Sequence, residues 1–210
     1  IIDALRFDFV IPSSNSIESS NSKFYHDNFP ILYQTFNNSP QNSLLLKFIA
    51  DPPTTTLQRL KGLTTGSLPT FSEAGSNFNG NDINEDNLIY QLFNNNRSIS
   101  FLGDDTWISL FNKYLNSNIS YPYESLNVWD LHSVDNGILM HLFPLLNSTE
   151  NSYDYINLNT SSSSPLPIEI ENHLVANSNR WDVLISHFLG VDHVGHRYGP
   201  SNFEMIPKLN

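Results

Sequence analysis

The segment Trp181-Asp-Val-Leu-Ile-Ser-His-Phe-Leu189, which continues as Gly190-Val-Asp-His-Val-Gly-His-Arg-Tyr-Gly-Pro200, is the most informative part of this 210-residue chain. Its first nine residues are apolar enough for a strand that is buried on both faces, as in a parallel sheet. A polar stretch with three glycines follows where that strand ends. We therefore predict a strand over residues 181–189 and a polar loop over 190–200, in which Gly195 allows a tight turn.

Strand-like and helix-like segments alternate in the rest of the chain. In the segment 54–65, Leu57, Leu60 and Leu63 are expected on one helix face, and Gly66 is the expected C-cap. This alternation predicts an α/β fold with a mostly parallel sheet flanked by helices, and a site beyond the carboxyl ends of the strands. A strand that runs into a loop is expected at 1–10, and further strands at 43–50 and 98–102. The helices are expected at 54–65, 85–94, 134–146 and, weakly, 167–176.

Composition narrows the class of protein. Hydrophobic residues make up 39% and charged residues 15%, with abundant Asn and Ser, so we expect one domain over residues 1–210 with a mobile Asn/Ser-rich insertion around 147–165. The net charge of -11 argues against a nucleic-acid partner, because backbone phosphates bind basic surfaces. The absence of Cys excludes disulfides and thiolate zinc sites, so any metal must be held by Asp, His or hydroxyl oxygen.

Two groups of carboxylate and imidazole side chains fall at predicted strand ends. Asp192 and His196 are four residues apart and can close on one metal ion; the alternative is a polar loop in which His193 and His196 face solvent. Asp3 ends the first predicted strand, where it is either a ligand or a cap or loop anchor.

The segment Pro53-Thr-Thr-Thr56 opens a predicted helix. Backbone N–H groups at a helix start favour anions such as phosphate, and a hydroxyl there is well placed to attack phosphorus. A threonine alcohol needs a base or a metal ion to act as a nucleophile. The alternative is that these threonines only cap the helix.

Three segments carry a resemblance to a known family. The segment Asp3-Ala-Leu-Arg-Phe-Asp8 is similar to the DGLRxD segment of the GPI ethanolamine phosphate transferases. Residues 53–66 resemble the PTxTxPxxxxxxTG nucleophile segment of the nucleotide pyrophosphatase/phosphodiesterases, and residues 190–200 resemble the D-x-x-G-H-x-x-G-P metal motif of the same alkaline phosphatase superfamily. The three segments occur in the family's order, and similarity to the GPI ethanolamine phosphate transferases covers most of the chain outside the Asn/Ser-rich stretches.

The resemblance implies an alkaline-phosphatase-like sheet with two divalent metal ions, expected to be zinc, at its edge. One metal ion would bind Asp3 and the nucleophile, which is Thr56 because it holds the second threonine position of PTxT. The other would bind Asp192 and His196. The donor set leaves manganese open.

Further site residues also follow from the resemblance. Relatives use an Asn twenty-one residues after the nucleophile to hold a phosphate oxygen, which places Asn77 in that role unless 75–77 is only a turn. Relatives supply a further Asp-His pair in a DHG motif and a later His; no DHG occurs here, and His193 belongs to a different motif. We therefore expect a chain truncated at both ends, with the remaining ligands downstream, that binds zinc weakly and is inactive alone.

The implied activity transfers ethanolamine phosphate from phosphatidylethanolamine to a mannose, the third, of a GPI-anchor precursor. The expected location is the endoplasmic reticulum membrane with this domain in the lumen, joined in the full protein to a membrane domain and a small stabilising membrane subunit. Two alternatives remain open, a soluble metal-dependent phosphodiesterase and a non-catalytic lumenal domain that binds glycolipid or a partner. Asp104 and Asp105 are expected to cap a loop. Five N-glycosylation sequons fit a lumenal domain, at Asn37, Asn96, Asn118, Asn147 and Asn159.

Overall fold

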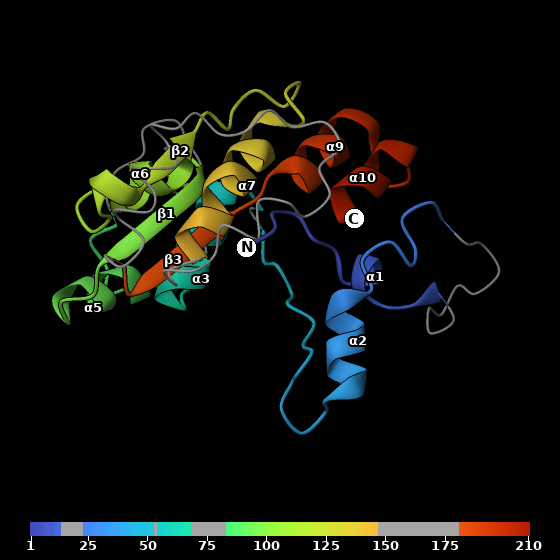
Figure 1. Cartoon of the computed structure of the whole chain (residues 1–210), viewed down its shortest axis with the longest axis horizontal. Coiled ribbons are helices and arrows are strands. Elements are labelled where there is room, and N and C mark those ends of the chain that lie inside the picture. The colour runs from blue at the N-terminus through green and yellow to red at the C-terminus, as the bar shows by residue number, and fades with distance from the viewer. Residues whose placement is uncertain (14–22, 53, 69–82, 147–180) are drawn as a thin grey trace.

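The computed structural model describes residues 1–13, 23–52, 54–68, 83–146 and 181–210 (Figure 1). The expected insertion around 147–165, the weak helix at 167–176 and the candidate phosphate ligand Asn77 lie outside these residues. None of the helices in the described ranges combines the length and the apolarity needed to span a bilayer.

A three-stranded parallel sheet forms the centre of the fold. Its strands are β1 (Ile99–Asp104), β2 (Tyr121–Tyr123) and β3 (Val183–His187), in the order β2-β1-β3. The strand β1 is buried along its whole length and pairs in parallel with both neighbours. Beyond β3, Ile2 forms a parallel bridge with Phe188, which places the amino-terminal segment alongside the carboxyl end of β3. The α/β prediction and the parallel sheet are confirmed.

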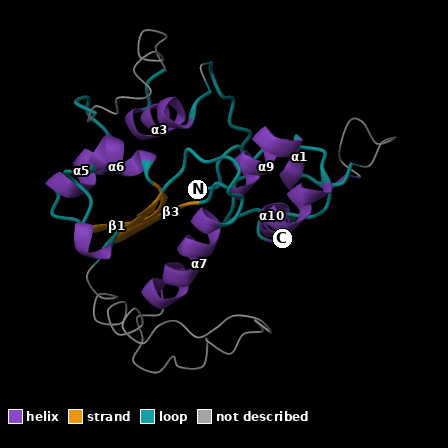
Figure 2. Cartoon of the chain, turned by 90° about the horizontal axis from the view of Figure 1, so that it is seen from above, coloured by secondary structure: helices purple, strands orange, loops and turns teal. Residues whose placement is uncertain are grey.

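Helices cover both faces of this sheet (Figure 2). On one face lie α3 (Thr56–Thr65), α5 (Leu88–Asn94) and α6 (Thr106–Phe111), and on the other lies α7 (Ser133–Leu146). Successive side chains of a strand point to opposite faces. The two cores therefore divide β1: Phe101 packs with Leu60, Ile89, Trp107 and Phe111, and Leu102 packs with Val134, Ile138 and Leu145.

A third apolar cluster lies beyond the carboxyl edge of the sheet. It joins α1 (Phe7–Val10), α9 (Gly190–Tyr198) and α10 (Ile206–Leu209) through buried Phe9 and Val194, among others. Because it ties the amino-terminal segment to α9, residues from both ends of the described chain lie at the same edge (Figure 1). Short 3-10 turns at Ser117–Ile119 (η2) and Phe203–Met205 (η4) complete the body.

Several predicted elements are confirmed, with small shifts at their ends. The helix expected at 54–65 is α3, and Gly66 ends it in a left-handed conformation at φ 71°. Leu60 is buried and Leu57 packs partly against the core, but Leu63 is exposed, because Thr64 rather than Leu63 continues the buried stripe. The elements expected at 85–94, 98–102, 134–146 and 181–189 are α5, β1, α7 and β3.

Three local predictions are wrong. The segment 1–10 extends as a strand only to the bridge at Ile2, and its end is helix α1. The segment 190–200 is mostly helix α9, with Gly195 inside it rather than at a turn. The segment 43–50 has no regular secondary structure, because neither edge of the described sheet pairs with it.

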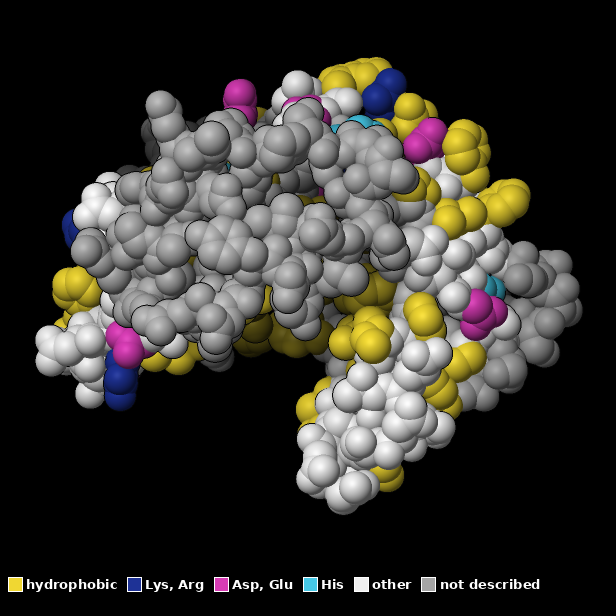
Figure 3. All heavy atoms as spheres, in the orientation of Figure 1, with side chains coloured by type: hydrophobic (Ala, Val, Ile, Leu, Met, Phe, Trp, Pro, Cys, Tyr) yellow, Lys and Arg dark blue, Asp and Glu magenta, His cyan; other side chains and the backbone are white. Residues whose placement is uncertain are grey.

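The segment 43–50 runs back from α2 (Ile31–Asn38), which projects from the body and buries none of its residues (Figure 1). Figure 3 shows apolar and uncharged polar side chains on this projection. Leu44, Leu46, Phe48 and Ile49 are all exposed, so the apolar run that predicted a strand does not contribute to the described core.

Candidate functional site

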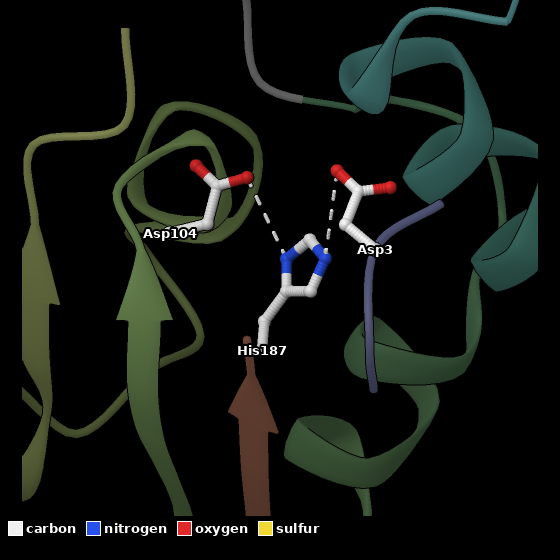
Figure 4. A group of neighbouring side chains, drawn as sticks. All are labelled: Asp3, Asp104 and His187. Carbon is white, nitrogen blue, oxygen red and sulfur yellow. Dashed lines mark ion pairs between the residues drawn. The ribbon is translucent and has the colours of Figure 1, made fainter. Parts of the chain in front are cut away.

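Four polar side chains from four segments meet at the carboxyl edge of the sheet. Asp3 follows the bridge at Ile2, Thr56 is the first residue of α3, Asp104 ends β1 and His187 ends β3. Figure 4 shows the imidazole of His187 between the carboxylates of Asp3 and Asp104. The structure thus brings together Asp3 and Thr56, which the sequence indicated, with Asp104 and His187, which it did not.

Thr56 is directed at Asp3. Its Oγ1 donates a hydrogen bond to Asp3 Oδ2 at 2.8 Å. The N-cap of α3 is the preceding residue, Thr55, which has extended backbone angles and makes no side-chain capping bond. Thr56 therefore does not serve as the N-cap; it is the first residue of α3, where the first-turn N–H groups have no partner within the helix, and its hydroxyl contacts a carboxylate.

A strained turn fixes the orientation of Asp3. Its backbone N–H donates to the Phe188 carbonyl oxygen at 2.9 Å, and its Oδ1 accepts the Ala4 N–H at 2.8 Å. Ala4 has φ 52°, a left-handed conformation that costs an L-residue about 1–2 kcal/mol. The similar family segment has Gly at this position, so the unusual backbone agrees with the motif.

His187 is 1% exposed and has polar neighbours at both ring nitrogens. The Trp107 indole N–H donates to its Nδ1 at 3.0 Å, Asp104 Oδ2 lies 3.5 Å from the same nitrogen, and Asp3 Oδ2 lies 3.9 Å from Nε2. Burial lowers the pKa of His187, although the carboxylates of Asp3 and Asp104 oppose that effect. Burial is the dominant cause, so the ring is neutral near pH 7 in the absence of a metal ion.

Asp104 accepts a hydrogen bond from the start of α6 and also lies beside His187 in the candidate site. It is almost completely buried, and its Oδ1 accepts the Thr106 N–H at 2.8 Å, at the start of α6. Its neighbour Asp105 points elsewhere and accepts the Ser125 hydroxyl. Gly103 allows β1 and β3 to approach here, since it has φ 123° and a Cβ would collide with the His187 carbonyl oxygen. Asp104 and His187 both end parallel strands, and that position was the signal that could have identified them.

The donor set suits a divalent cation. Asp3, Asp104 and His187 each offer one ligand atom, and these atoms lie within 4.8 Å of one another. Carboxylate oxygen and imidazole nitrogen are ligands of zinc and manganese. These residues therefore form a group that could hold a metal ion.

The predicted pair Asp192 and His196 lies on α9, one helical turn apart. His196 Nε2 is 3.5 Å from Asp192 Oδ1, but the His196 side chain is 64% exposed and that of Asp192 21%. Burial raises the pKa of Asp192, the negative charges of Asp3 and Asp104 raise it further, and His196 and His193 oppose the rise. A bound cation would favour the charged form of Asp192 and reduce its repulsion from the carboxylates of Asp3 and Asp104.

His193 anchors α9 instead of facing solvent. It is buried, with Nδ1 2.7 Å from the Asp130 carbonyl oxygen and Nε2 3.1 Å from the Ser125 carbonyl oxygen. The alternative in which both His193 and His196 face solvent is therefore wrong for His193. Both of its nitrogens are engaged, which agrees with its exclusion as a ligand.

Asp135 of α7 fixes the start of α9. Its Oδ1 accepts the N–H groups of Leu189 and Gly190, both at 3.0 Å, and its Oδ2 pairs with Lys208 Nζ at 3.0 Å. A Cβ on Gly190 would collide with the Asp135 carboxylate. These bonds satisfy N–H groups at the start of α9, a helix that the sequence alone did not predict. They also fix the position of α9, and therefore of Asp192, relative to α7.

Comparison with known proteins shows which proteins this chain is similar to. No family model matches the chain, and no solved structure does. Among curated proteins, GPI ethanolamine phosphate transferase 3 of Eremothecium gossypii is 52% identical over 99% of this chain, and that of Saccharomyces cerevisiae is 51% identical over 99%. The human GPI ethanolamine phosphate transferase 3, catalytic subunit, is 43% identical over 100% of the chain.

The chain resembles GPI ethanolamine phosphate transferase 3 over nearly its whole length. The family resemblance drawn from the sequence motifs is confirmed. The chain spans 18% of the two fungal GPI ethanolamine phosphate transferase 3 proteins and 16% of the human one. The matched stretch includes both the Asp3–Thr56 contact and α9.

Proposed function

We propose that this chain carries the nucleophile of a GPI ethanolamine phosphate transferase, and that Thr56 accepts ethanolamine phosphate from phosphatidylethanolamine before a mannose of a GPI precursor receives it. The observation that carries this proposal is the 2.8 Å hydrogen bond from Thr56 Oγ1 to Asp3 Oδ2 at the start of α3. About half of the residues are identical to those of fungal GPI ethanolamine phosphate transferase 3 proteins, at 52% and 51%. This similarity supports ethanolamine phosphate as the transferred group.

The amino-terminal end of α3 is suited to the donor phosphate. The ten residues of α3 direct their first free N–H groups and the positive end of the helix dipole towards this edge. A phosphodiester lying there has its phosphorus next to Thr56 Oγ1. Asn77, outside the described residues, is our candidate for holding one of its oxygens.

Two divalent cations, zinc in our proposal, fit the carboxylates at this edge. Asp3 and Thr56 would hold one ion and Asp192 and His196 the other, with the remaining ligands supplied from elsewhere in the full protein. When bound, such ions lower the pKa of a coordinated hydroxyl and neutralise charge on the phosphate oxygens.

The reaction proceeds in two transfers. Thr56 Oγ1, oriented by Asp3, bonds to the donor phosphorus while the bond to the diacylglycerol oxygen breaks, and the threonine proton ends on diacylglycerol. A mannose hydroxyl, the third mannose in our proposal, then bonds to the same phosphorus. The bond to Thr56 breaks, and the mannose proton returns to Thr56. The protein's contribution is mainly positioning and charge stabilisation, as in other phosphoryl transfers.

We further propose that the domain faces the lumen of the endoplasmic reticulum as part of a membrane protein with a small stabilising subunit. Three sequons fall on described residues, at Asn37, Asn96 and Asn118, and all three asparagines are exposed. Exposure is a condition for their glycosylation, which takes place in that compartment.

Replacement of Thr56 in the full-length protein tests the function. In cells that carry Thr56→Ala as the sole copy, we expect transfer to fall at least about 10³-fold. Mass spectrometry should then show accumulation of a GPI precursor that lacks one ethanolamine phosphate, at a normal protein level. Thr55→Ala is the matched control, because Thr55 is exposed and makes no side-chain capping bond.

A normal precursor profile in the Thr56→Ala cells would overturn the proposal. Hydrolysis of a chromogenic phosphodiester by the purified protein, with water as acceptor and no transfer to the glycolipid, would favour a phosphodiesterase instead.

A further inference from the structure

Buried contacts fix both the side chain and the backbone of His187, although this residue lies outside the nucleophile motif. Trp107 fixes it from one side: its indole ring is buried between Phe101 and Phe111, at centroid distances of 5.4 and 5.3 Å, and its N–H donates to His187 Nδ1. The backbone of His187 is fixed as well, because it pairs with Gly103 in the sheet. The imidazole therefore cannot turn without breaking the bond to a buried indole.

The bond from Trp107 also decides which nitrogen carries the ring proton. An imidazole nitrogen that accepts a hydrogen bond has a free lone pair, so in the neutral ring the proton lies on the other nitrogen. Since Nδ1 accepts from Trp107, the proton is on Nε2, which faces Asp3 Oδ2 at 3.9 Å. This gap is about 1 Å longer than a hydrogen bond, within the range of a small side-chain shift.

The same geometry argues against His187 as a ligand that shares one ion with both carboxylates. Figure 4 shows the contacts to Asp104 and Asp3 leaving from opposite nitrogens of the ring. An ion bound at Nδ1 next to Asp104 would displace the Trp107 N–H, and an ion at Nε2 would lie on the far side of the ring from the Asp104 contact. Although the ligand atoms lie within 4.8 Å of one another, sharing one ion would therefore cost either the Trp107 bond or the Asp104 contact.

We propose that His187 is a positioning residue for the nucleophile site. Its Nε2–H closes on Asp3 Oδ2 and, together with the Ala4 N–H on Oδ1, holds the carboxylate in the orientation that receives Thr56 and a metal ion. Trp107 acts through His187 by fixing its tautomer. The inference rests on the proposed function only in taking Asp3 as a metal ligand.

Three replacements of His187 in the full-length protein separate this role from packing. Zinc is titrated into the metal-depleted protein in competition with a chromogenic chelator, without substrate. His187→Ala should weaken zinc binding about 10- to 100-fold, the usual effect of losing a partner of a metal ligand. His187→Gln should restore most of the affinity, because its amide N–H reaches the place of Nε2. His187→Asn is the matched control, equally polar but too short to reach Asp3.

Trp107→Phe tests the tautomer, because it keeps an aromatic ring and removes only the N–H. We expect zinc binding weaker than wild type but stronger than in His187→Ala. Equal affinities for the Gln and Asn variants, or wild-type affinity for His187→Ala, would overturn the positioning role.

Asp3→Asn distinguishes a failure of this inference from a failure of the proposed function. If Asp3→Asn binds zinc as tightly as wild type, Asp3 is not a ligand and both proposals lose their basis. If Asp3→Asn loses zinc while His187→Ala keeps it, only the role of His187 is wrong.

Discussion

The two groups of candidate ligands differ in how far the described chain has already organised them. Asp3 and Thr56, which come from different segments, are joined by a 2.8 Å hydrogen bond, and Asp3 also lies 3.9 Å from the buried His187. Asp192 and His196 share one helix and a single 3.5 Å contact, and His196 is largely exposed. The nucleophile group is therefore fixed by its own tertiary contacts, whereas the position of the second group depends on how α9 is anchored.

Removal of the carboxylate that anchors α9 should give the largest difference in local stability between the Asp192–His196 group and the Asp3–Thr56 group. Asp135→Ala removes the acceptor of two backbone N–H groups and leaves Lys208, with a side chain that is 7% exposed, without its partner. Breaking a buried pair in this way costs about 3–5 kcal/mol. In hydrogen-exchange mass spectrometry of the full-length protein, amides of α9 should exchange more than about 100-fold faster, and those of α3 should not change.

Asp130→Ala is the control for this experiment. Asp130 is a more exposed carboxylate that accepts the N–H groups of His132 and Ser133 before α7, and its loss should cost about 1 kcal/mol. Equal exchange in α3 and α9 after Asp135→Ala would contradict the view that the two groups are held independently.

Asp192→Asn should stabilise the folded protein, by less than Asp135→Ala destabilises it. Because the pKa of Asp192 is raised in the folded protein, the unfolded chain releases this proton first as pH rises. Stability is therefore lost as pH rises from about 4, the unfolded pKa, through the raised folded pKa. In metal-free protein at pH 7, Asp192→Asn should be more stable than wild type by on the order of 1 kcal/mol, and the advantage should vanish towards pH 3.

Thermal unfolding in the presence of a chelator, at both pH values, measures this difference. His196→Ala is the control and should change stability by less than about 0.5 kcal/mol, because the side chain is exposed. Added zinc should reverse the order of Asp192→Asn and wild type. A metal-free Asp192→Asn protein that is less stable than wild type at pH 7 would show that burial and the neighbouring carboxylates do not disfavour the charged form of Asp192.

The sequence predicted the parts of this structure that depend on local pattern. The strands expected at 98–102 and 181–189 are present with ends shifted by one or two residues, and the helix expected at 54–65 begins at Thr56 and ends at its glycine cap. The motifs also located Asp3 and Thr56. Whether Asp3 and Thr56 act as proposed remains a prediction.

What the sequence did not predict depends on contacts between distant residues. Helix α9 begins where Asp135, more than fifty residues earlier, accepts the N–H groups of Leu189 and Gly190. The sequence does not show this contact, so a loop with a turn at Gly195 was predicted instead. The place of His187 next to Asp3 required the strand order and the bridge at Ile2. The apolar segment 43–50 has the composition of a strand but no partner in the described sheet.

The most direct test of the central claim is to look for ethanolamine phosphate on Thr56 itself. Full-length protein is incubated with phosphatidylethanolamine and zinc but without the glycolipid acceptor, then digested and analysed by tandem mass spectrometry. The account predicts a phosphoethanolamine adduct on Thr56 that is absent from Thr56→Ala and disappears when the acceptor is added. An adduct on Thr54 or Thr55, or transfer that proceeds at the wild-type rate in Thr56→Ala, would contradict it.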